Sequence, residues 1–322
     1  MDQSTQDRVE LRPAEEAEVR TGAKGHAALP WAALICAVAA LAVSFGALKL
    51  AWPAPEPKPE PVAVQESVPA YAPVEYITYK EHQLPVEEGL AVSAWEPMGF
   101  TRQENGWIRY ESGEVTALQG IDVSSHQGKI DWEAVAESGI SFAMIRVGYR
   151  GYGEEGRLVL DEQFHPNMQG AINAGLDVGV YFFSQATSVW EAEEEAKLLL
   201  NALEGYEVTW PVVFDWERIA ESSARTDGVA GKSVGLMARA FCGMVEQAGY
   251  TPGVYFNQNL GYLSLELDEL TDCVFWLAQY DERPDFHYHA DLWQYSSRGK
   301  VPGISVPVDL NLSYKNFNEP EA

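Results

Sequence analysis

The chain has 322 residues, with 22 Lys and Arg against 48 Asp and Glu, and a formal net charge of -26 at pH 7. This length allows one or two domains, since a typical domain holds about 100–200 residues. So acidic a balance argues against nucleic acid as a partner, because phosphate binding needs a basic surface. The 3 Cys are too few for a disulfide scaffold, and their spacing matches no zinc site. The acid excess is either a solubilising surface or, at a few positions, part of a chemical site.

A charged N-terminal head is followed by an apolar run. The head, residues 1–26, holds four Lys and Arg, and the uncharged run covers residues 27–48. A bilayer-spanning helix needs about 20 apolar residues, and this run is too long for the core of a signal peptide. We therefore predict a transmembrane helix at 27–50. Fewer Lys and Arg follow the run than precede it, so we expect a cytoplasmic N-terminus and an extracellular remainder.

Two further segments precede the main domain. Residues 51–73 contain seven Pro, interspersed with Glu, Ala and Lys, which is typical of a semi-rigid polyproline II linker. Residues 74–119 carry aromatic and β-branched residues around Asn105-Gly106, a pair that predicts a β-hairpin turn. We predict a small β-ribbon here. Its NGWIRY stretch also resembles the hairpins of cell-wall-binding modules, which leaves a wall-binding role open.

From Gly120 onwards, short apolar runs alternate with amphipathic stretches, the pattern of a parallel α/β barrel or sheet. Strands are expected at 121–124, 142–148, 178–184, 212–215, 253–256, 274–278, 292–295 and 308–311. Helices are expected between the first five strands, at 132–138, 164–174, 189–203 and 233–248. A Gly follows each of these helices, where a left-handed residue commonly ends a helix. The predicted fold class is α/β, an irregular TIM-like (β/α)5β3 barrel over residues 120–322, with its active site at the C-terminal ends of the strands.

Four acidic residues lie at or near the ends of these strands. Asp122 lies in GIDVSSHQG, Asp215 and Glu217 lie in PVVFDWE, and Asp309 lies in VPVDLN. Residues i and i+2 of a strand point to the same side, so Asp215 and Glu217 should face one cleft. Burial and like-charge repulsion would raise the pKa of at least one carboxyl group. A protonated acid beside an ionised carboxylate is what glycosidic bond cleavage requires.

Aromatic residues near the same strand ends favour a sugar ligand. Their faces can stack on the C–H side of sugar rings while neighbouring polar groups bind hydroxyls, although each ring could instead be a core residue. The predicted substrate-binding set is Tyr149, Tyr181, Phe183, Tyr255, Trp276, Tyr280, Trp293 and Gln294.

Six motifs occur in order along this domain. They are GIDVSSHQGKIDW (120–132), YFFSQA (181–186), FDWE (214–217), WLAQY (276–280), LWQYSS (292–297) and VDLN (308–311). Together they resemble the glycoside hydrolase family 25 lysozymes over about residues 120–315. The resemblance implies an irregular five-helix, eight-strand barrel that hydrolyses the β-1,4 bond from N-acetylmuramic acid to N-acetylglucosamine in peptidoglycan. It implies no metal and no organic cofactor.

The resemblance also implies roles for the four acids. Glu217 would be the general acid, and Asp215 its paired carboxylate, which stabilises positive charge or orients the 2-acetamido group. Asp122 and Asp309 would complete the acidic cleft. The segment RVGYRGYGEEG departs from the lysine-containing version of many family members and is expected to shape substrate choice.

The remaining candidates are weaker. His126 and Gln127 follow Asp122 and either bind near the cleft or form a structural turn. His287 and His289 are interpreted as loop or cap residues. A metal site is not expected at this pair, because two His without a third ligand rarely bind a metal.

Two further features are the Cys pair of the main domain and one acidic run. Cys242 and Cys273 either pair in a disulfide or remain buried free thiols. The acidic run 191–195 lies on a predicted helix and is interpreted as a solvated face.

The combined hypothesis is a peptidoglycan muramidase tethered to a bacterial cell membrane by a single helix, with its catalytic barrel outside the cell. Residues 120–322 carry 13 basic and 31 acidic side chains, a net of -18, so anionic wall polymers would repel the barrel and a tether would position it. Two alternatives stay open. One is a non-catalytic wall-binding or scaffolding protein, and the other is a related glycosidase acting on another N-acetylhexosamine polymer such as chitin.

Overall fold

The computed structural model describes residues 74–219 and 223–319 of the chain. The predicted cytoplasmic head, transmembrane helix and Pro-rich linker therefore lie outside the described residues. Within the described ranges, every helix is too short or too polar to cross a bilayer.

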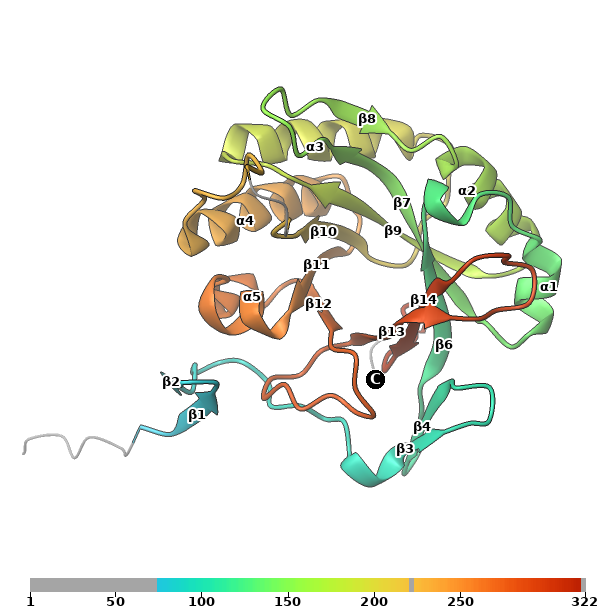
Figure 1. The fold of residues 1–322 in the computed structure, drawn as a ribbon, viewed down its shortest axis with the longest axis horizontal. Helices are drawn as coiled ribbons and strands as arrows, with labels where there is room; N and C mark the ends of the chain where they lie inside the picture. Colours follow the sequence, from blue (N-terminus) through green and yellow to red (C-terminus); the bar gives the residue numbers. More distant parts are fainter. Residues whose placement is uncertain (1–73, 220–222, 320–322) are drawn as a thin grey trace, which may run out of the picture. The chain divides into compact units, whose positions relative to one another are not determined.

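Eight strands form a closed barrel (Figure 1). They are β6 (Leu118–Val123), β7 (Phe142–Arg150), β9 (Asp177–Ser184), β10 (Val212–Trp216), β11 (Pro252–Asn257), β12 (Val274–Ala278), β13 (Leu292–Gly299) and β14 (Val308–Ser313). Strand β6 pairs with both β7 and β14, which closes the barrel. A further short strand, β8 (Leu158–Leu160), pairs with β7 outside the ring. The barrel and its eight strand positions are confirmed, but the parallel pattern is not complete: β14 runs antiparallel to both β13 and β6.

Among the described residues, five α-helices lie outside the strands. They are α1 (Trp132–Glu137), α2 (Phe164–Asn173), α3 (Val189–Ala202), α4 (Gly231–Gln247) and α5 (Gln258–Leu263), with short 3-10 turns η2 (Pro97–Gly99), η3 (Ser125–Gln127) and η4 (Leu267–Leu270). The Asp131 and Ser188 side chains accept hydrogen bonds from backbone N–H groups at the starts of α1 and α3, which satisfies donors that have no partner inside the helix. Gly139, Gly175 and Gly249 have φ values of 96°, 79° and 87°, so the predicted left-handed helix ends are confirmed.

The inside of the barrel is filled by side chains at alternate strand positions, so it is a packed core and not a pore. Its buried residues include Phe142, Met144, Trp210, Val213 and Leu292. Gly120 makes room for them, since a Cβ at this position would lie 2.2 Å from the Phe142 ring. The polar residues of the barrel are therefore left for its mouth.

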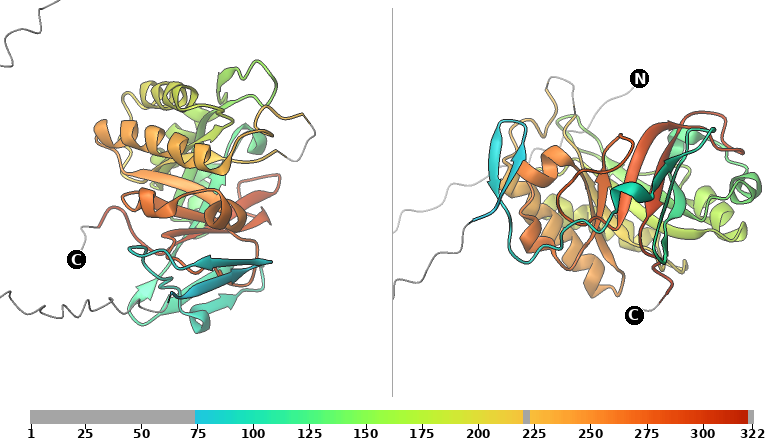
Figure 2. Two further views of the ribbon diagram at one scale, coloured as in Figure 1. Left: turned by 90° about the vertical axis from the view of Figure 1, so that its left-hand side faces the viewer. Right: turned by 90° about the horizontal axis from the view of Figure 1, so that it is seen from below.

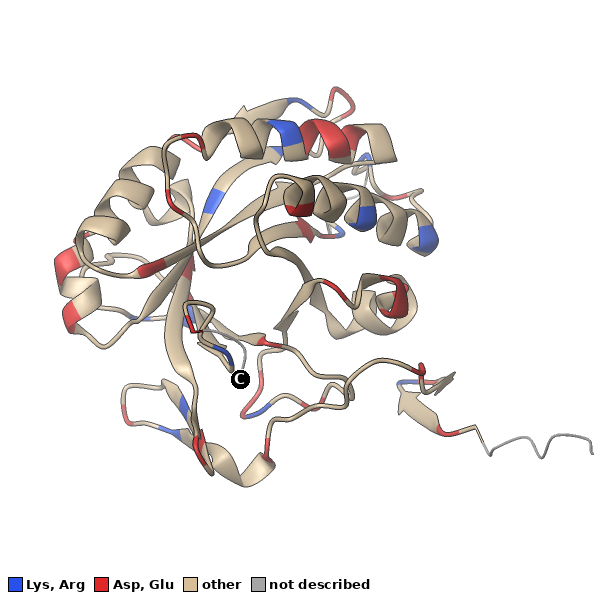
Figure 3. Ribbon diagram, turned by 180° about the vertical axis from the view of Figure 1, so that it is seen from behind, with Lys and Arg blue, Asp and Glu red and all other residues tan. Residues whose placement is uncertain are grey.

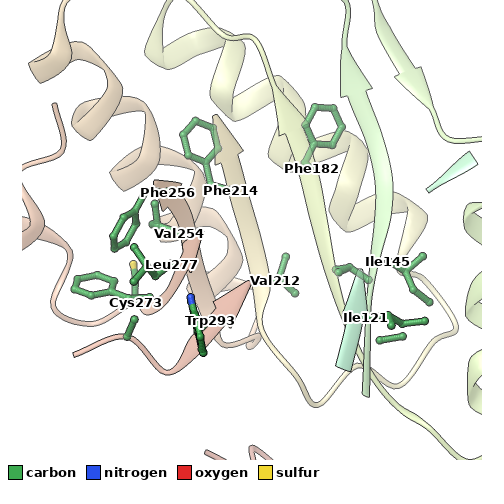
Figure 4. Packing of buried hydrophobic residues seen from close by; sticks show 14 of the residues in the cluster. Ile121, Ile145, Phe182, Val212, Phe214, Val254, Phe256, Cys273, Leu277 and Trp293 are labelled. Carbon is green, nitrogen blue, oxygen red and sulfur yellow. The ribbon is translucent and has the colours of Figure 1, made fainter. Parts of the chain in front are cut away.

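The second hydrophobic layer lies between the strands and the elements outside them (Figure 4). Phe182, Phe214, Val254 and Phe256 belong to this layer. Helices supply the outer wall for most of the ring, but no helix follows β13 or β14 among the described residues. Something else must cover these two strands.

Residues 74–117 provide that cover. They form the hairpin β1 (Tyr76–Tyr79) and β2 (His82–Pro85) and a small antiparallel sheet of β3 (Phe100–Arg102), β4 (Ile108–Ser112) and β5 (Val115–Thr116). Strands β3 and β4 are joined at Asn105-Gly106, so the predicted hairpin turn is confirmed. Figure 2 shows this segment lying along the side of the barrel.

Aromatic packing joins this segment to the barrel. The Trp95 and Phe100 rings lie 6.4 and 5.3 Å from the Trp293 ring, which points outward from β13. Trp95 Nε1 donates to the Ala290 carbonyl at 2.8 Å, and Trp107 Nε1 donates to the Lys300 carbonyl at 3.2 Å. The ribbon thus packs on the barrel as part of the same domain, at strands that no described helix covers.

The acidic run on α3 corrects the prediction of a solvated face. Glu195 is fully buried, and its Oε1 lies 2.7 Å from Nε of the buried Arg150, while Glu191 Oε1 lies 2.5 Å from Arg225 Nη2. Burial raises the pKa of Glu195 to about 7, although Arg150 opposes the shift. This network ties α3 to the loop after β7 and to the segment that begins at residue 223. Other acidic residues lie on the outer helices and loops, as Figure 3 shows.

Candidate active site

A cavity of about 300 Å³ opens at one end of the barrel. It is lined by all four predicted acids and by polar and aromatic residues from nearly every strand: Asp122, Ser124, His126, Gln127, Arg146, Tyr181, Phe183, Asp215, Glu217, Tyr255, Trp276, Tyr280, Gln294 and Asp309. The parallel strands reach this mouth with their C-terminal ends, where barrel enzymes place their active sites. The predicted convergence of the four carboxylates is therefore confirmed.

Asp122 is buried in the lining of the cavity and is held by two amide groups. Gln294 Nε2 and Asn311 Nδ2 each donate to Asp122 Oδ2 at 2.8 Å. The Tyr255 and Tyr280 hydroxyls in turn donate to Gln294 Oε1, both at 2.9 Å. Burial raises the pKa of Asp122 to about 6, while the two amide hydrogen bonds favour the carboxylate and limit the rise.

Asp215 and Glu217 share the next part of the cavity. Asp215 is 4% exposed and its Oδ1 has no hydrogen-bond partner among the described residues, whereas Glu217 lies nearer the opening. Burial, together with the Glu217 and Asp122 charges, holds the pKa of Asp215 well above its usual range. Burial and Asp122 also raise the pKa of Glu217. The pair therefore holds a proton more tightly than ordinary carboxyl groups do.

Asp309 reaches the mouth by a different route from the one predicted. It is the second residue of β14 and lies opposite Asp122 in the antiparallel pair, so it begins a strand instead of ending one. Because β14 is antiparallel, its N-terminal end meets the C-terminal ends of the other strands. Burial and the nearby Asp122 charge raise the pKa of Asp309 to about 8.

Asp309→Asn is expected to stabilise the protein at high pH. The native carboxyl binds its proton more tightly than the unfolded one, so wild-type stability should fall as pH rises from about 4 to about 8. At pH 9 the variant lacks this buried charge, and its Tm should exceed that of the wild type by about 2–4 °C, the shift for roughly 1 kcal/mol in a domain of this size. The two melting curves should coincide at pH 4. A gap of the same size at both pH values would contradict the raised pKa.

Some of the predicted substrate-binding residues line the cavity and others do not. Tyr181, Phe183, Tyr255, Trp276, Tyr280 and Gln294 line the cavity. Trp293 was wrongly placed: it is fully buried on the outside of β13, because adjacent residues of a strand face opposite ways and Gln294 faces inward. Tyr149 is not among the lining residues, and its ring lies 5.2 Å from the Arg146 guanidinium.

Two functional residues escaped the sequence analysis. Asn311 holds Asp122, and Arg146 places a cation in the cavity, where it opposes the upward pKa shift of Asp215. Arg146 is itself held by the buried Asp161, whose Oδ2 lies 2.8 Å from Arg146 Nε. An Arg in the middle of an apolar strand was the available signal, since a buried charge needs a partner.

Hydrogen bonds from buried neighbours also fix the backbone around Glu217. Gln185 is fully buried and donates from Nε2 to the Glu217 carbonyl at 2.7 Å, while Trp216 Nε1 donates to the Ala186 carbonyl at 2.9 Å. Thr226 Oγ1 donates to Gln185 Oε1 at 3.2 Å. The loop after β9 thus positions the acid-bearing end of β10.

Of the other candidates, His126 and Gln127 both line the cavity. Gln127 also closes a turn, because its Oε1 accepts a hydrogen bond from the Ser124 backbone N–H. Cys242 and Cys273 are buried free thiols. His289 Nδ1 accepts a hydrogen bond from the Ala94 backbone N–H.

Comparison with known proteins agrees with this geometry. The profile of glycosyl hydrolases family 25 matches residues 121–304. The chain belongs to this family. The predicted resemblance and the prediction of a glycoside hydrolase are both confirmed.

Individual relatives are similar over the same part of the chain. The protein YegX of Escherichia coli (strain K12) is 32% identical over 220 residues, which cover 64% of this chain and 72% of YegX. The autolytic lysozyme of Clostridium acetobutylicum is 28% identical over 195 residues, covering 60% of this chain and 55% of that protein. The modular autolysin LytC of Streptococcus pneumoniae, solved with a synthetic peptidoglycan ligand, shares the fold with a TM-score of 0.55 and 24% identity, over 67% of this chain and 52% of LytC. The chain thus spans about half the length of the last two proteins.

Proposed function

We propose that this chain is a peptidoglycan muramidase that cleaves the β-1,4 bond between N-acetylmuramic acid and N-acetylglucosamine. The observation that carries the proposal is the convergence of four carboxyl groups in one cavity. Burial and neighbouring charges raise the pKa of each of them. Family membership supports the reaction type, and the lysozyme relative and the ligand of LytC support the substrate.

In this reaction Glu217, which directly follows β10, donates its proton to the glycosidic oxygen, since its side chain is more accessible than that of Asp215. Asp215 stabilises the positive charge that develops on the sugar, or orients the 2-acetamido group. Asp122 and Asp309 surround this pair, and the two amides on Asp122 fix its carboxylate. Tyr280, which is 57% exposed, offers its ring to a bound sugar.

The reducing ends released from purified peptidoglycan test the activity. The full chain, or residues 71–322, which form one compact unit, is incubated with the polymer and the new ends are identified. Ends of N-acetylmuramic acid are expected. Ends of N-acetylglucosamine would identify a glucosaminidase, and cleavage of chitin instead of peptidoglycan would favour another N-acetylhexosamine polymer. Binding to the wall without any release would favour a scaffolding protein.

We also propose that residues 27–48 anchor the chain in a bacterial cell membrane, with the barrel outside. Their uncharged, apolar sequence supports a spanning helix, and the four Lys and Arg of residues 1–26 support a cytoplasmic N-terminus. The seven Pro of residues 51–73 would hold the barrel away from the membrane.

Fractionation of cells should detect this anchor. The full chain is expected in the membrane fraction after a high-salt wash, and the chain without residues 1–50 is expected to leave it. External protease should degrade the barrel in intact spheroplasts. Recovery of the full chain in the salt wash would contradict the anchor, and protection of the barrel would contradict its orientation.

A further inference from the structure

A second cavity, of about 440 Å³, adjoins the catalytic one. It is lined by Arg102, Tyr280, Asp281, Glu282, Tyr295, Ser296, Ser297 and Arg298. Tyr280 lines both cavities, so its ring forms part of the boundary between them. The catalytic cavity, at about 300 Å³, is at the lower end of the range for ligand sites, and a polymeric substrate must extend over the adjoining surface.

The lining of the second cavity suits a neutral, hydroxyl-rich ligand. Two arginines face two carboxylates, so the set has no net charge, whereas an acidic ligand would require a positive excess. Guanidinium, carboxylate and serine hydroxyl groups together supply many hydrogen-bond donors and acceptors, and Tyr280 supplies an exposed aromatic face. A sugar that carries hydroxyl and acetamido groups can form hydrogen bonds to these polar groups while its ring stacks on Tyr280.

Arg102 gives this cavity a feature that the matched family region lacks. It lies on β3, in the segment that covers β13, outside the matched residues 121–304. Its Nε lies 2.8 Å from Glu282 Oε2, and its Nη1 donates to the Gly106 carbonyl at 2.9 Å. Both side chains of the ion pair stay accessible, at 42% and 74% exposed, so Arg102 is held in place but is not covered.

We propose that the second cavity binds the neighbouring saccharide of the glycan strand and that Arg102 is one of its ligands. The covering segment 74–117 then has two roles, since it closes the side of the barrel and extends the substrate groove. This inference rests on the proposed function, because it takes the glycan strand as the substrate.

Kinetics of full-length Arg102→Gln on substrates of two lengths test the proposal. The substrates are long glycan strands stripped of their peptides and the shortest oligosaccharide that the wild type cleaves. For long strands we expect KM to rise about five-fold, the factor for one or two lost hydrogen bonds, with kcat within two-fold. For the shortest oligosaccharide both constants should be unchanged.

Arg109→Gln is the matched control. Arg109 is exposed on β4, opposite Thr101, and faces away from the barrel. Its substitution therefore removes the same charge without changing the lining of the cavity. Glu282→Gln distinguishes the contribution of the ion pair from that of ligand binding by Arg102. It breaks the pair but keeps Arg102, so KM on long strands should rise less than in Arg102→Gln. Arg298→Gln, on the other side of the cavity, should reproduce the effect of Arg102→Gln.

Three results would overturn the subsite. The first is an equal KM for the Arg102 and Arg109 variants on long strands, and the second is an equal rise in KM of the Arg102 variant on long and short substrates. The third is a rise in KM of the Arg102 variant that occurs only when the stem peptides are present, because the peptide would then be the ligand. Failure of the wild type to cleave any strand would instead refute the proposed muramidase activity. In that case, titration of the same stripped strands into the wild type and the Arg102 variant still measures the subsite.

Discussion

Glu217→Gln is expected to lower kcat on peptidoglycan by about 10³-fold, within the range that general acid catalysis contributes. The amide keeps the shape of the side chain but has no proton to give to the leaving oxygen. The backbone carbonyl of residue 217 still accepts the hydrogen bond from Gln185 Nε2, so the backbone of the site should be unaffected. The rate of release of reducing ends, measured at saturating substrate, gives the loss directly.

The pH profile separates this role from a structural one. In the wild type, kcat should fall on the alkaline side as the raised pKa of the Asp215 and Glu217 pair is passed and the proton is lost. The residual activity of the variant should lack that alkaline fall. Glu137→Gln makes the same chemical change at an exposed position of α1, away from both cavities, and should keep kcat within two-fold. If Glu217→Gln keeps more than a tenth of the wild-type kcat, the general acid is a residue other than Glu217.

The strands and most helices could be predicted because their signals are local. Apolar runs such as 212–214 mark buried strands, and the Gly residues after helices mark their ends. The acid pair at Asp215 and Glu217 followed from the same rule, since alternate residues of one strand share a face. These features need no information from distant parts of the chain.

The features that were missed depend on distant partners. Strand β14 lies between β13 and β6, and its direction is decided by that pairing, so Asp309 could not be assigned to the start of a strand. In the run from Leu292 to Tyr295 both faces are buried, and hydrophobicity alone could not show that Trp293 faces outward. Glu195 resembles a surface acid until Arg150, 45 residues earlier, is placed beside it.

The covering segment gives the largest expected effect on stability. Trp95 is 6% exposed, and its ring packs within 4.8 Å of Tyr110 and 4.9 Å of Tyr314. Trp95→Ala removes these contacts and the hydrogen bond to the Ala290 carbonyl, and should destabilise the protein by about 3–5 kcal/mol. Thermal unfolding should shift down by roughly 10 °C. Met98→Ala, in the same segment but 94% exposed, should leave the Tm unchanged.

The activity of Trp95→Ala below its melting temperature shows whether the covering segment affects the active site as well as stability. Trp95 supports β13 from outside through Trp293, whereas the next residue, Gln294, faces inward and holds Asp122. At 10 °C, where the variant remains folded, the shortest substrate should therefore be cleaved at close to the wild-type kcat. Low kcat in a folded Trp95→Ala would mean that the covering segment sets the geometry of the acids as well as the stability of the barrel. An unchanged Tm would mean that residues 74–117 are a separate module, because the barrel would then be complete without them.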